Sequence, residues 1–381
     1  MRSSDVLIVG AGPAGLAAAI ALRQHGAEVL VADAQRPPID KACGEGLMPD
    51  GVRELSRLGI SLDVLHGDAF HGITFVSDMS RVAADFSQGE GRGVRRTVLH
   101  RLLLDRASEL GVRFSWNTPA ILRRGQPLSL ADAPCFYRWL IGADGHASRV
   151  RAWASLDCGR MRSRRFGFRA HCRVRAQGSE SSRSHVEVHW GALGQAYLTP
   201  VGNGEICISA VTRDAGLRLA DILAAIPSLR GRFDMAQATS VERGCLTLSR
   251  RFRRVTQGNI ALIGDASGSA DAITGEGLAL AFRQASLLAE SLHAGSLDLY
   301  QARHAATLAL AQRMSTLLLL LDRQHALRRR AVQALAAHPG WFGEFLAVHL
   351  GEQPLQRFVL RRGAQLGLGI LSASPSHSLA R

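Results

Sequence analysis

The feature that most constrains this chain is a glycine-rich turn between an apolar run and a helix-forming segment. Residues 6–9 are apolar and are bounded by glycine, a pattern typical of a buried parallel strand. Gly10, Gly12 and Gly15 follow with G-x-G-x-x-G spacing: the first permits a tight turn, the second admits a pyrophosphate, and the third lets a helix pack closely. The Ala/Leu-rich residues 16–23 would point a helix N-terminus at those phosphates. The unit predicts a dinucleotide site.

An acidic residue completes this unit. Gly26 ends the predicted helix, residues 28–32 form a second predicted strand, and Asp33 follows it directly. A carboxylate in this position accepts hydrogen bonds from ribose hydroxyls. Asp33 therefore favours FAD or NAD over NADP.

Composition limits the class of protein but identifies no partner. The 381 residues suffice for one large domain or two to three smaller ones, and 46% hydrophobic with 20% charged residues is ordinary globular composition. A formal charge of +14 arises almost entirely from arginine, since Lys41 is the only lysine. The Arg-rich runs lack a nucleic-acid-binding motif, so we expect no nucleic acid partner. A basic surface leaves contact with a membrane or an anionic partner open.

Neither a metal site nor a membrane-crossing helix is predicted. The six cysteines lack CxxC pairs and Cys/His metal spacing, so no zinc site and no disulfide framework is expected. The N-terminus lacks the pattern of a secretory signal, and the longest apolar run near the C-terminus is far shorter than the ~20 residues of a spanning helix. We expect a cytoplasmic protein.

The strand-and-helix pattern returns twice after the first unit. Residues 139–142 form an apolar strand that leads into Asp144 and Gly145, and residues 260–263 form another that leads into Gly264 and Asp265. Between these returns, residues 70–86 predict a hairpin and residues 166–212 predict short antiparallel strands. Helices are predicted towards the C-terminus. Because ligands bind at the carboxyl ends of parallel strands, a carboxylate such as Asp265 in the last of these turns could bond sugar hydroxyls.

Three separated segments resemble one family. GAGPAG, IGADGHASRVR and IGDASGSADAITGEG are similar to the FAD motifs of the superfamily of flavoprotein hydroxylases, flavin-dependent halogenases and geranylgeranyl reductases. The resemblance implies an α/β fold: a Rossmann-like FAD-binding domain (1–69, 94–152 and 255–295), an inserted antiparallel β-sheet substrate domain (70–93 and 153–254) and a C-terminal helical region (296–381). The flavin ring would lie beneath the inserted sheet.

The same resemblance implies the cofactor contacts. Gly10, Gly12, Gly15 and Asp33 would bind the ADP half of FAD, and Arg96 would contact FAD at the start of a helix. Asp265, after Gly264, matches the aspartate that bonds the ribitol. Asp144 and Gly145 match a motif linked to cofactor and nicotinamide handling, while Gly275, Gly277 and Leu278 would approach the flavin pyrimidine edge.

The branch within the superfamily follows from departures in the motifs. Aromatic hydroxylases commonly carry a histidine and paired prolines in the third segment, where this chain has Gly268, Asp271 and Ala272. The K-A-C-G-E-G loop at 41–46 resembles the cysteine-glycine loop of geranylgeranyl reductases, and Tyr197 with Pro200 preserves part of another of their motifs. The tryptophans of a tryptophan-type halogenase would fall at Gln195 and Tyr197, which argues against halogenation.

Three functions remain open, and the first is favoured over the second. The first is an FAD-dependent monooxygenase that uses NADH or NADPH and O2 to hydroxylate a hydrophobic or aromatic substrate, which a carrier could present. The second is a flavin-dependent reductase of carbon–carbon double bonds, in which Cys43 helps to protonate or position the alkene. The third is a flavin-bound partner protein without turnover. Cys43, Lys41 and Tyr197 are the predicted catalytic residues.

Aromatic residues of the inserted sheet suggest either a hydrophobic pocket or an ordinary core. Aromatic residues at alternating positions there could line such a pocket together: Phe166, Phe168, Trp190 and Tyr197. Alternating aromatic residues more often belong simply to a sheet core. The histidines of these strands, such as His171, are possible acid–base groups, but none is nominated.

Overall fold

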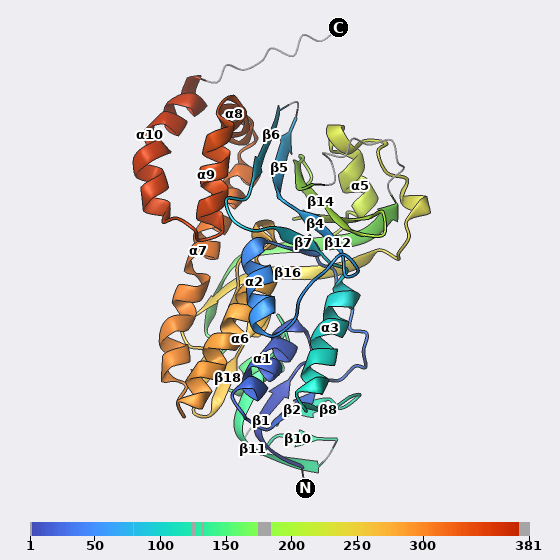
Figure 1. The fold of residues 1–381 in the computed structure, drawn as a ribbon, viewed down its shortest axis with the longest axis vertical. Helices are drawn as coiled ribbons and strands as arrows, with labels where there is room; N and C mark the ends of the chain where they lie inside the picture. The colour runs from blue at the N-terminus through green and yellow to red at the C-terminus, as the bar shows by residue number, and fades with distance from the viewer. Residues whose placement is uncertain (1, 79, 124–125, 132, 174–183, 373–381) are drawn as a thin grey trace.

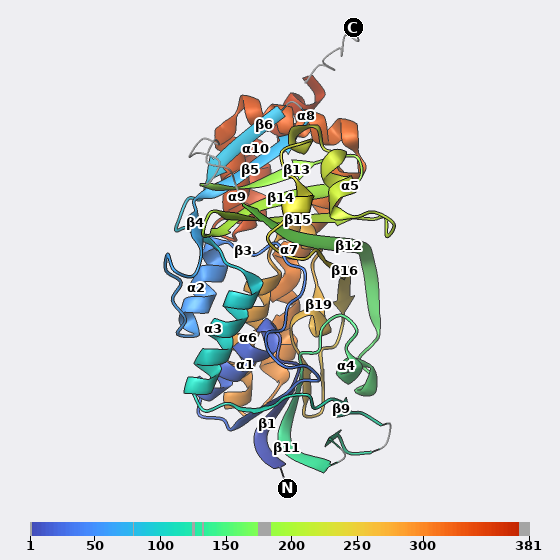
Figure 2. The ribbon, with the colours of Figure 1, turned by 90° about the vertical axis from the view of Figure 1, so that its right-hand side faces the viewer.

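The computed structural model describes the whole chain except residues 1, 79, 124–125, 132, 174–183 and 373–381. A domain built around a parallel sheet holds the N-terminus, and a second sheet is stacked against it along the long axis (Figures 1 and 2). Helices from the last third of the chain run along both parts. The predicted α/β class, with an inserted sheet and a C-terminal helical region, is confirmed; the exact domain boundaries stay predictions.

The first sheet brings the carboxyl ends of its parallel strands to one edge. β1 (Arg2–Val9) lies between β2 (Val29–Ala32) and β11 (Ala133–Gly142), and the sheet continues to β8 (Arg113–Ser115) on one side and β18 (Ile260–Leu262) on the other. These five strands pair in parallel, whereas β17 (Thr256–Gln257) closes the edge antiparallel. The three predicted motifs therefore meet at one edge of this sheet.

Helix α1 (Pro13–Gln24) forms the centre of the layer that covers this sheet. It packs against α3 (Arg96–Glu109) and α6 (Gly277–His293), and nine of its residues are buried. Small side chains make this close packing possible, since Ala17, Ala18 and Ala19 are fully buried. α2 (Pro49–Arg57) lies against α6, close to the junction with the second sheet.

The second sheet has eight strands and is larger than the sequence patterns predict. Its order is β19 (Gly268–Ser269), β16 (Arg243–Phe252), β12 (Gly159–Arg173), β15 (Glu205–Thr212), β14 (Gln195–Gly202), β13 (His185–Trp190), β5 (Gly72–Ser77) and β6 (Ser80–Asp85). The predicted hairpin is β5–β6. Its pairing with β13 is parallel, so the sheet is not wholly antiparallel as expected. β16 gave no clear signal because exposed arginines interrupt its apolar alternation.

Three short strands join the two sheets. β3 (Gly46–Leu47), β7 (Gly91–Gly93) and β4 (Asp68–Phe70) form a small sheet in which both outer strands pair with β7. β4 and β7 also contact β14 of the second sheet. The loop at 41–46, which we call the cysteine loop, is thereby held at the junction of the two domains.

The C-terminal third is helical: α7 (Asp298–Arg323), α8 (His325–Ala337), α9 (Pro339–His349) and α10 (Leu355–Ser372). Pro339 starts α9 at a position where its missing N–H costs no hydrogen bond. By length and composition, α7 alone among the described helices could cross a membrane, and 39% of its apolar window is buried. It packs on α6 and α9, as core helices of globular domains do. The last nine residues of the predicted helical region lie outside the described chain.

Candidate functional site

The glycine turn after β1 is shaped for a phosphate group. Gly10 has a φ of +110°, and a Cβ there would lie 2.4 Å from the carbonyl oxygen of Ala143; a Cβ on Gly15 would lie 1.9 Å from the carbonyl oxygen of Gly10. Around Gly12 no described atom lies within 4 Å of the equivalent point. No described side chain caps α1, so its first N–H groups are available to an anion.

Asp33 lies where the ribose was expected. It follows β2, and its Oδ2 accepts a hydrogen bond of 2.7 Å from the Ala11 N–H. Sequence reasoning missed His100, whose Nε2 lies 2.9 Å from the Ala11 carbonyl oxygen. Burial lowers the pKa of His100, so the neutral ring can donate to that carbonyl. Both side chains therefore fix the backbone of the glycine turn at Ala11.

Two buried polar atoms next to this edge fit a cofactor that is not part of the structure. Arg96 Nε and Asp144 Oδ1 have no hydrogen-bond partner among the described residues. The other oxygen of Asp144 accepts from the N–H groups of Arg149 (2.7 Å) and Val150 (3.1 Å) and so caps α4 (Arg149–Trp153). Because buried polar groups are normally paired, these two atoms are suited to bind FAD. Gly145, with a φ of +79°, forms the open turn beside them.

Asp265 is placed by a turn that only glycine can make without strain. Gly264 has a φ of +59°, and a Cβ there would lie 2.6 Å from the Cβ of Ala14. The Asp265 carboxylate lies 3.2 Å from Lys41 Nζ and 3.1 Å from His146 Nε2. Burial alone would raise the pKa of Asp265, but the Lys41 ammonium group, with a smaller contribution from His146, holds this pKa below its usual range. The residue is therefore an anion at neutral pH.

Lys41 consequently lies beside the cofactor site. Its ammonium group pairs with Asp265, which the resemblance assigns to the ribitol. A role of Lys41 in catalysis stays a prediction. The structure brings it together with a cofactor residue 224 positions away in the sequence.

A buried acid lies in the turn at residues 272–277. We call this segment the flavin turn, because the resemblance places the flavin pyrimidine edge there. Gly275 has a φ of +70°, Gly277 starts α6, and the half-buried Leu278 packs on the core of the first domain. Glu276 is 3% exposed, and its Oε2 has no hydrogen-bond partner among the described residues. Burial raises the pKa of Glu276 although His349 Nε2 lies 4.0 Å away. Glu276 is an additional proton-carrying group that sequence reasoning did not nominate.

Cys43 is held between the two domains by its own loop. Its sulfur accepts a hydrogen bond of 3.4 Å from the Glu45 N–H, and its carbonyl accepts one of 3.6 Å from the Cys207 thiol on β15. On β16, Cys245 donates to the Ala42 carbonyl at 3.8 Å. The loop is therefore fixed against the second sheet, and the Cys43 side chain is half-buried.

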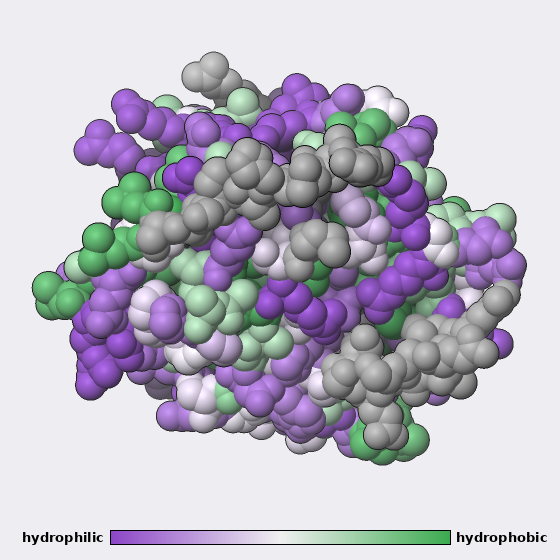
Figure 3. Space-filling model, turned by 90° about the horizontal axis from the view of Figure 1, so that it is seen from above, coloured by the Kyte–Doolittle hydropathy of each residue, from purple (hydrophilic) through white to green (hydrophobic). Residues whose placement is uncertain are grey.

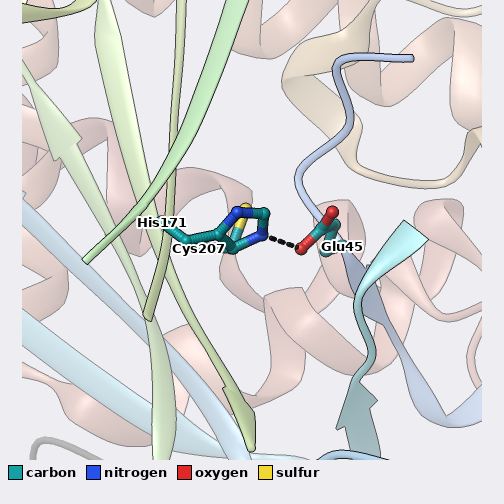
Figure 4. A group of neighbouring side chains, drawn as sticks. All are labelled: Glu45, His171 and Cys207. Carbon is teal, nitrogen blue, oxygen red and sulfur yellow. Dashed lines mark hydrogen bonds and ion pairs between the residues drawn. The ribbon is translucent and has the colours of Figure 1, made fainter. Parts of the chain in front are cut away.

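Glu45 and His171 form a buried ion pair under this loop (Figure 4). Glu45 Oε2 lies 2.6 Å from His171 Nε2, and both side chains are 1% exposed. The other oxygen of Glu45 accepts from the Arg96 N–H at 2.9 Å and lies 3.7 Å from Arg169 Nε. Glu45 has a φ of +57°, unusual for a side-chain-bearing residue, so this network holds it in a strained conformation.

A metal ion is not the best explanation of this cluster. Ligand atoms of Glu45, His171 and Cys207 lie within 4.8 Å of one another. However, Arg169 already supplies positive charge there, and burial raises the pKa of the Cys207 thiol well above its usual value. A thiol must lose its proton to bind a metal. The three residues therefore form an internal hydrogen-bond network that positions the loop.

The side of the second sheet that faces this loop has two different halves. The first, which we call the polar half, consists of polar residues of β12 and their partners: Glu45, Arg165, Arg169, His171 and Asp271. The second, which we call the apolar half, consists of a hydrophobic cluster on β5, β13 and β14 and on the helix α9 that covers it: Phe75, Val188, Trp190, Tyr197 and Phe342. In the polar half Arg165 pairs with Asp271 at 3.2 Å, with both side chains almost fully buried.

The four aromatic residues of the second sheet belong to two separate hydrophobic clusters and do not line one common pocket. Phe168 lies in the core beneath α5 (Leu219–Ala224), together with the half-buried Phe166. Trp190 and Tyr197 belong to the apolar half instead, because alternate residues of a strand point to opposite faces. The Tyr197 hydroxyl lies 3.5 Å from the Ile273 carbonyl oxygen in the flavin turn. Burial raises the pKa of Tyr197, so the hydroxyl stays protonated.

The comparisons with known proteins agree with this geometry. The model of an FAD binding domain family matches residues 3–126. A menaquinone reductase of Mycobacterium tuberculosis is 30% identical over 354 residues, which cover 83% of this chain and 84% of that protein. The chain belongs to the superfamily of flavoprotein hydroxylases, halogenases and geranylgeranyl reductases. This flavoprotein is thus an FAD-dependent oxidoreductase.

Other similar proteins match most of the chain. Digeranylgeranylglycerophospholipid reductase 2 of Methanosphaera stadtmanae is 24% identical over 305 residues, 73% of this chain and 75% of that protein. The crystal structure of a flavoprotein/dehydrogenase from Cytophaga hutchinsonii superposes with a TM-score of 0.81 at 17% identity, covering 98% of this chain and all of the other. At that identity the superposition establishes the fold alone.

Proposed function

We propose that this flavoprotein is a reductase that saturates carbon–carbon double bonds in an isoprenoid lipid. Two similar proteins are named reductases, one of menaquinone and one of a digeranylgeranylglycerophospholipid. The geranylgeranyl chains of the latter offer double bonds to a hydride donor. The observation that carries the proposal is Cys43, a half-buried thiol that the Glu45 network holds at the junction of the two domains.

The reaction needs a hydride and a proton on neighbouring carbons. Bound, reduced FAD supplies the hydride, and NADH or NADPH is the proposed source of its electrons. The thiol of Cys43 holds the proton, and the resulting thiolate regains a proton from water. Lys41 of the cysteine loop and Asp265 neutralise one another, so neither charge is left unpaired when the substrate enters.

The apolar half supports an apolar substrate. Trp190 packs edge-to-face on Phe75 with ring centroids 5.9 Å apart, and Phe342 lies 4.9 Å from Phe75. This cluster reaches the flavin turn at Ile273. A hydrocarbon chain loses little hydration free energy on entering such surroundings, whereas a charged substrate would lose much more.

The test is anaerobic turnover of the purified protein. The FAD-loaded protein, reduced with dithionite, is incubated with a geranylgeranyl lipid in detergent, and mass spectrometry detects the addition of two hydrogen atoms per saturated bond. Cys43→Ala should lower the rate by ~10²- to 10⁴-fold, the usual contribution of a general acid. Cys158→Ala is the matched control, because Cys158 is exposed and lies outside the cysteine loop. No saturated product, or equal rates in both variants, rejects the proposal.

A monooxygenase reaction is the second candidate. It is favoured by the buried apolar half, which adjoins the flavin turn at Ile273, because oxygen transfer from a reduced flavin requires exclusion of water. With NADH or NADPH and labelled O2, a hydroxylated product would carry one labelled oxygen atom. The reductase reaction incorporates none, so the two candidates are separated in one experiment.

A further inference from the structure

The C-terminal helix α10 leaves one apolar side uncovered. Its inner side packs on α8 and α9 through Phe358 and Leu366, and a Cβ on Gly369 would lie 3.3 Å from Ala334. Its outer side carries large apolar residues that are mostly exposed: Leu360 (86%), Leu368 (67%) and Leu371 (74%). With Ala364 and Gly367 their spacing is i, i+4, i+7, i+8 and i+11, which defines a single helix face.

Positive charge borders the same face. Arg357 and Arg361 are exposed on the outer side, and α10 contains no acidic residue. Glu344 of α9 is neutralised by Arg362 of α10 at 2.6 Å. In Figure 3, hydrophobic groups project between hydrophilic ones at the edge where Figure 1 places α10. Leucines bordered by arginines match the chemistry of an anionic bilayer surface.

The inner side of α10 is continuous with the apolar half. Leu366 packs against the same hydrophobic cluster that contains Ile273 of the flavin turn and Tyr197. The helix therefore connects the uncovered face with the apolar core beside the reaction centre. A lipid substrate reaches an enzyme from a membrane, so a membrane-facing helix at this position would serve the proposed reaction.

We propose that α10 docks this flavoprotein on the surface of an anionic membrane. Leu360, Leu368 and Leu371 enter the boundary between headgroups and acyl chains, and Arg357 and Arg361 contact the lipid phosphates. A second copy of the chain fits this face less well, because pairing two α10 helices would oppose arginines with arginines and no carboxylate on the helix would compensate them. The proposal rests on the proposed function only for the lipid nature of the substrate.

Vesicle sedimentation of the FAD-loaded full chain tests the proposal without turnover. Wild-type protein should bind vesicles that contain roughly a third phosphatidylglycerol, bind phosphatidylcholine vesicles at least ~10-fold more weakly, and lose affinity in high salt. Leu360→Ser/Leu368→Ser should weaken binding by at least ~10-fold. Arg357→Gln/Arg361→Gln should weaken binding by about 10-fold on anionic vesicles only.

The matched control replaces equally exposed apolar residues elsewhere. Val64 and Leu65, 81% and 85% exposed, lie on the loop between α2 and β4, and Val64→Ser/Leu65→Ser should bind as wild type. Flavin absorbance and melting temperature check that each variant is folded; if the leucine variant unfolds, the arginine variant decides. Absence of wild-type binding, equal binding to both vesicles, or equal loss in the control overturns the proposal. A change from dimer to monomer in the leucine variant, without loss of vesicle binding, also overturns it.

The outcome is separable from the proposed reaction. In detergent, all these variants should reduce a solubilised lipid at the wild-type rate, because none of the replaced residues contacts the cysteine loop or the flavin turn. Loss of vesicle binding with unchanged turnover in detergent supports docking through α10. Vesicle binding without any turnover leaves docking intact and rejects the reductase reaction.

Discussion

The polar and apolar halves of the second sheet hold the same junction by opposite means. In the apolar half, side chains such as Phe342 (0% exposed) gain stability from burial, at about 1.5–3 kcal/mol for each large residue. In the polar half, Glu45, His171 and Arg169 are equally buried, but the cost of removing their charges from water offsets most of their attraction. The apolar half therefore supplies stability, whereas the polar half fixes the position of the cysteine loop.

Removal of the main aromatic residue of the apolar half should have the largest effect on stability. Phe342→Ala leaves a cavity against Phe75, so we expect the free energy of unfolding to fall by about 3–5 kcal/mol. Urea denaturation followed by fluorescence measures this. Phe136→Ala is the control, since Phe136 is 52% exposed and should cost less than about 0.5 kcal/mol. Equal losses in both variants would remove the distinction between the halves.

A nearly isosteric change in the polar half should cost less. Glu45→Gln keeps the shape of the side chain but removes the charge that pairs with His171, so we expect a loss of about 1.5–3 kcal/mol in the same measurement. Turnover should fall as well, because the loop that carries Cys43 loses its anchor. Glu109→Gln, in the exposed pair with Arg106, should change stability by about 0–1 kcal/mol. A Glu45 variant as stable and as active as wild type would contradict a positioning role.

Glu276 should make stability depend on pH in the direction opposite to an ordinary paired carboxylate. Burial raises its pKa in the folded protein, so its contribution to stability is complete below the unfolded pKa and is lost as pH rises through the folded pKa. Glu276→Gln removes this loss, and its melting temperature should exceed that of wild type increasingly from acidic to neutral pH.

Melting curves at a series of pH values measure the difference for Glu276→Gln. Glu290→Gln, an exposed position on the same helix, should follow the wild-type profile. Parallel profiles for wild type and Glu276→Gln would show that the carboxyl is solvated at the junction.

The smallest effect is expected from the one hydroxyl of the apolar half. Tyr197→Phe removes a hydrogen bond of 3.5 Å, close to the upper limit of length, so stability should fall by less than about 1 kcal/mol. If Cys43 is the proton donor, turnover should change by only a few-fold, rather than the ~10²- to 10⁴-fold of a general acid. A large loss of turnover with intact stability would move the proton donor from the cysteine loop to the apolar half.

The FAD-binding edge was predictable because its parts are local. The turn at Gly10–Gly15 depends on glycines whose φ angles and close approaches follow directly from spacing, and the structure shows the expected steric need at Gly10 and Gly15. The strand-to-turn segments at Asp144 and Asp265 carry the same kind of local signal. Their meeting at one edge followed from the parallel pairing of β1, β11 and β18.

The second sheet was harder to predict because its partners are distant in sequence. β16 pairs with β12 although its alternation is interrupted by arginines, and β5 joins β13 across more than a hundred residues. The positions of Phe166 and Phe168 show the same limit: alternation indicates that a strand has two faces, but it does not show which face lies towards the first domain. Glu45, His146 and Glu276 were missed since a single acid or histidine has no periodic signal.

The sequence by itself determined the glycine turn after the first strand, an inserted sheet and a helical C-terminal region, because glycine geometry and apolar periodicity act over a few residues, and the family resemblance added the prediction of a three-segment FAD site. Tertiary structure alone decided what the charged side chains do. It paired Lys41 with Asp265 and Glu45 with His171, across 224 and 126 positions, and it left the leucines of α10 uncovered. Burial and ion pairing depend on distances between segments, which local sequence patterns do not encode.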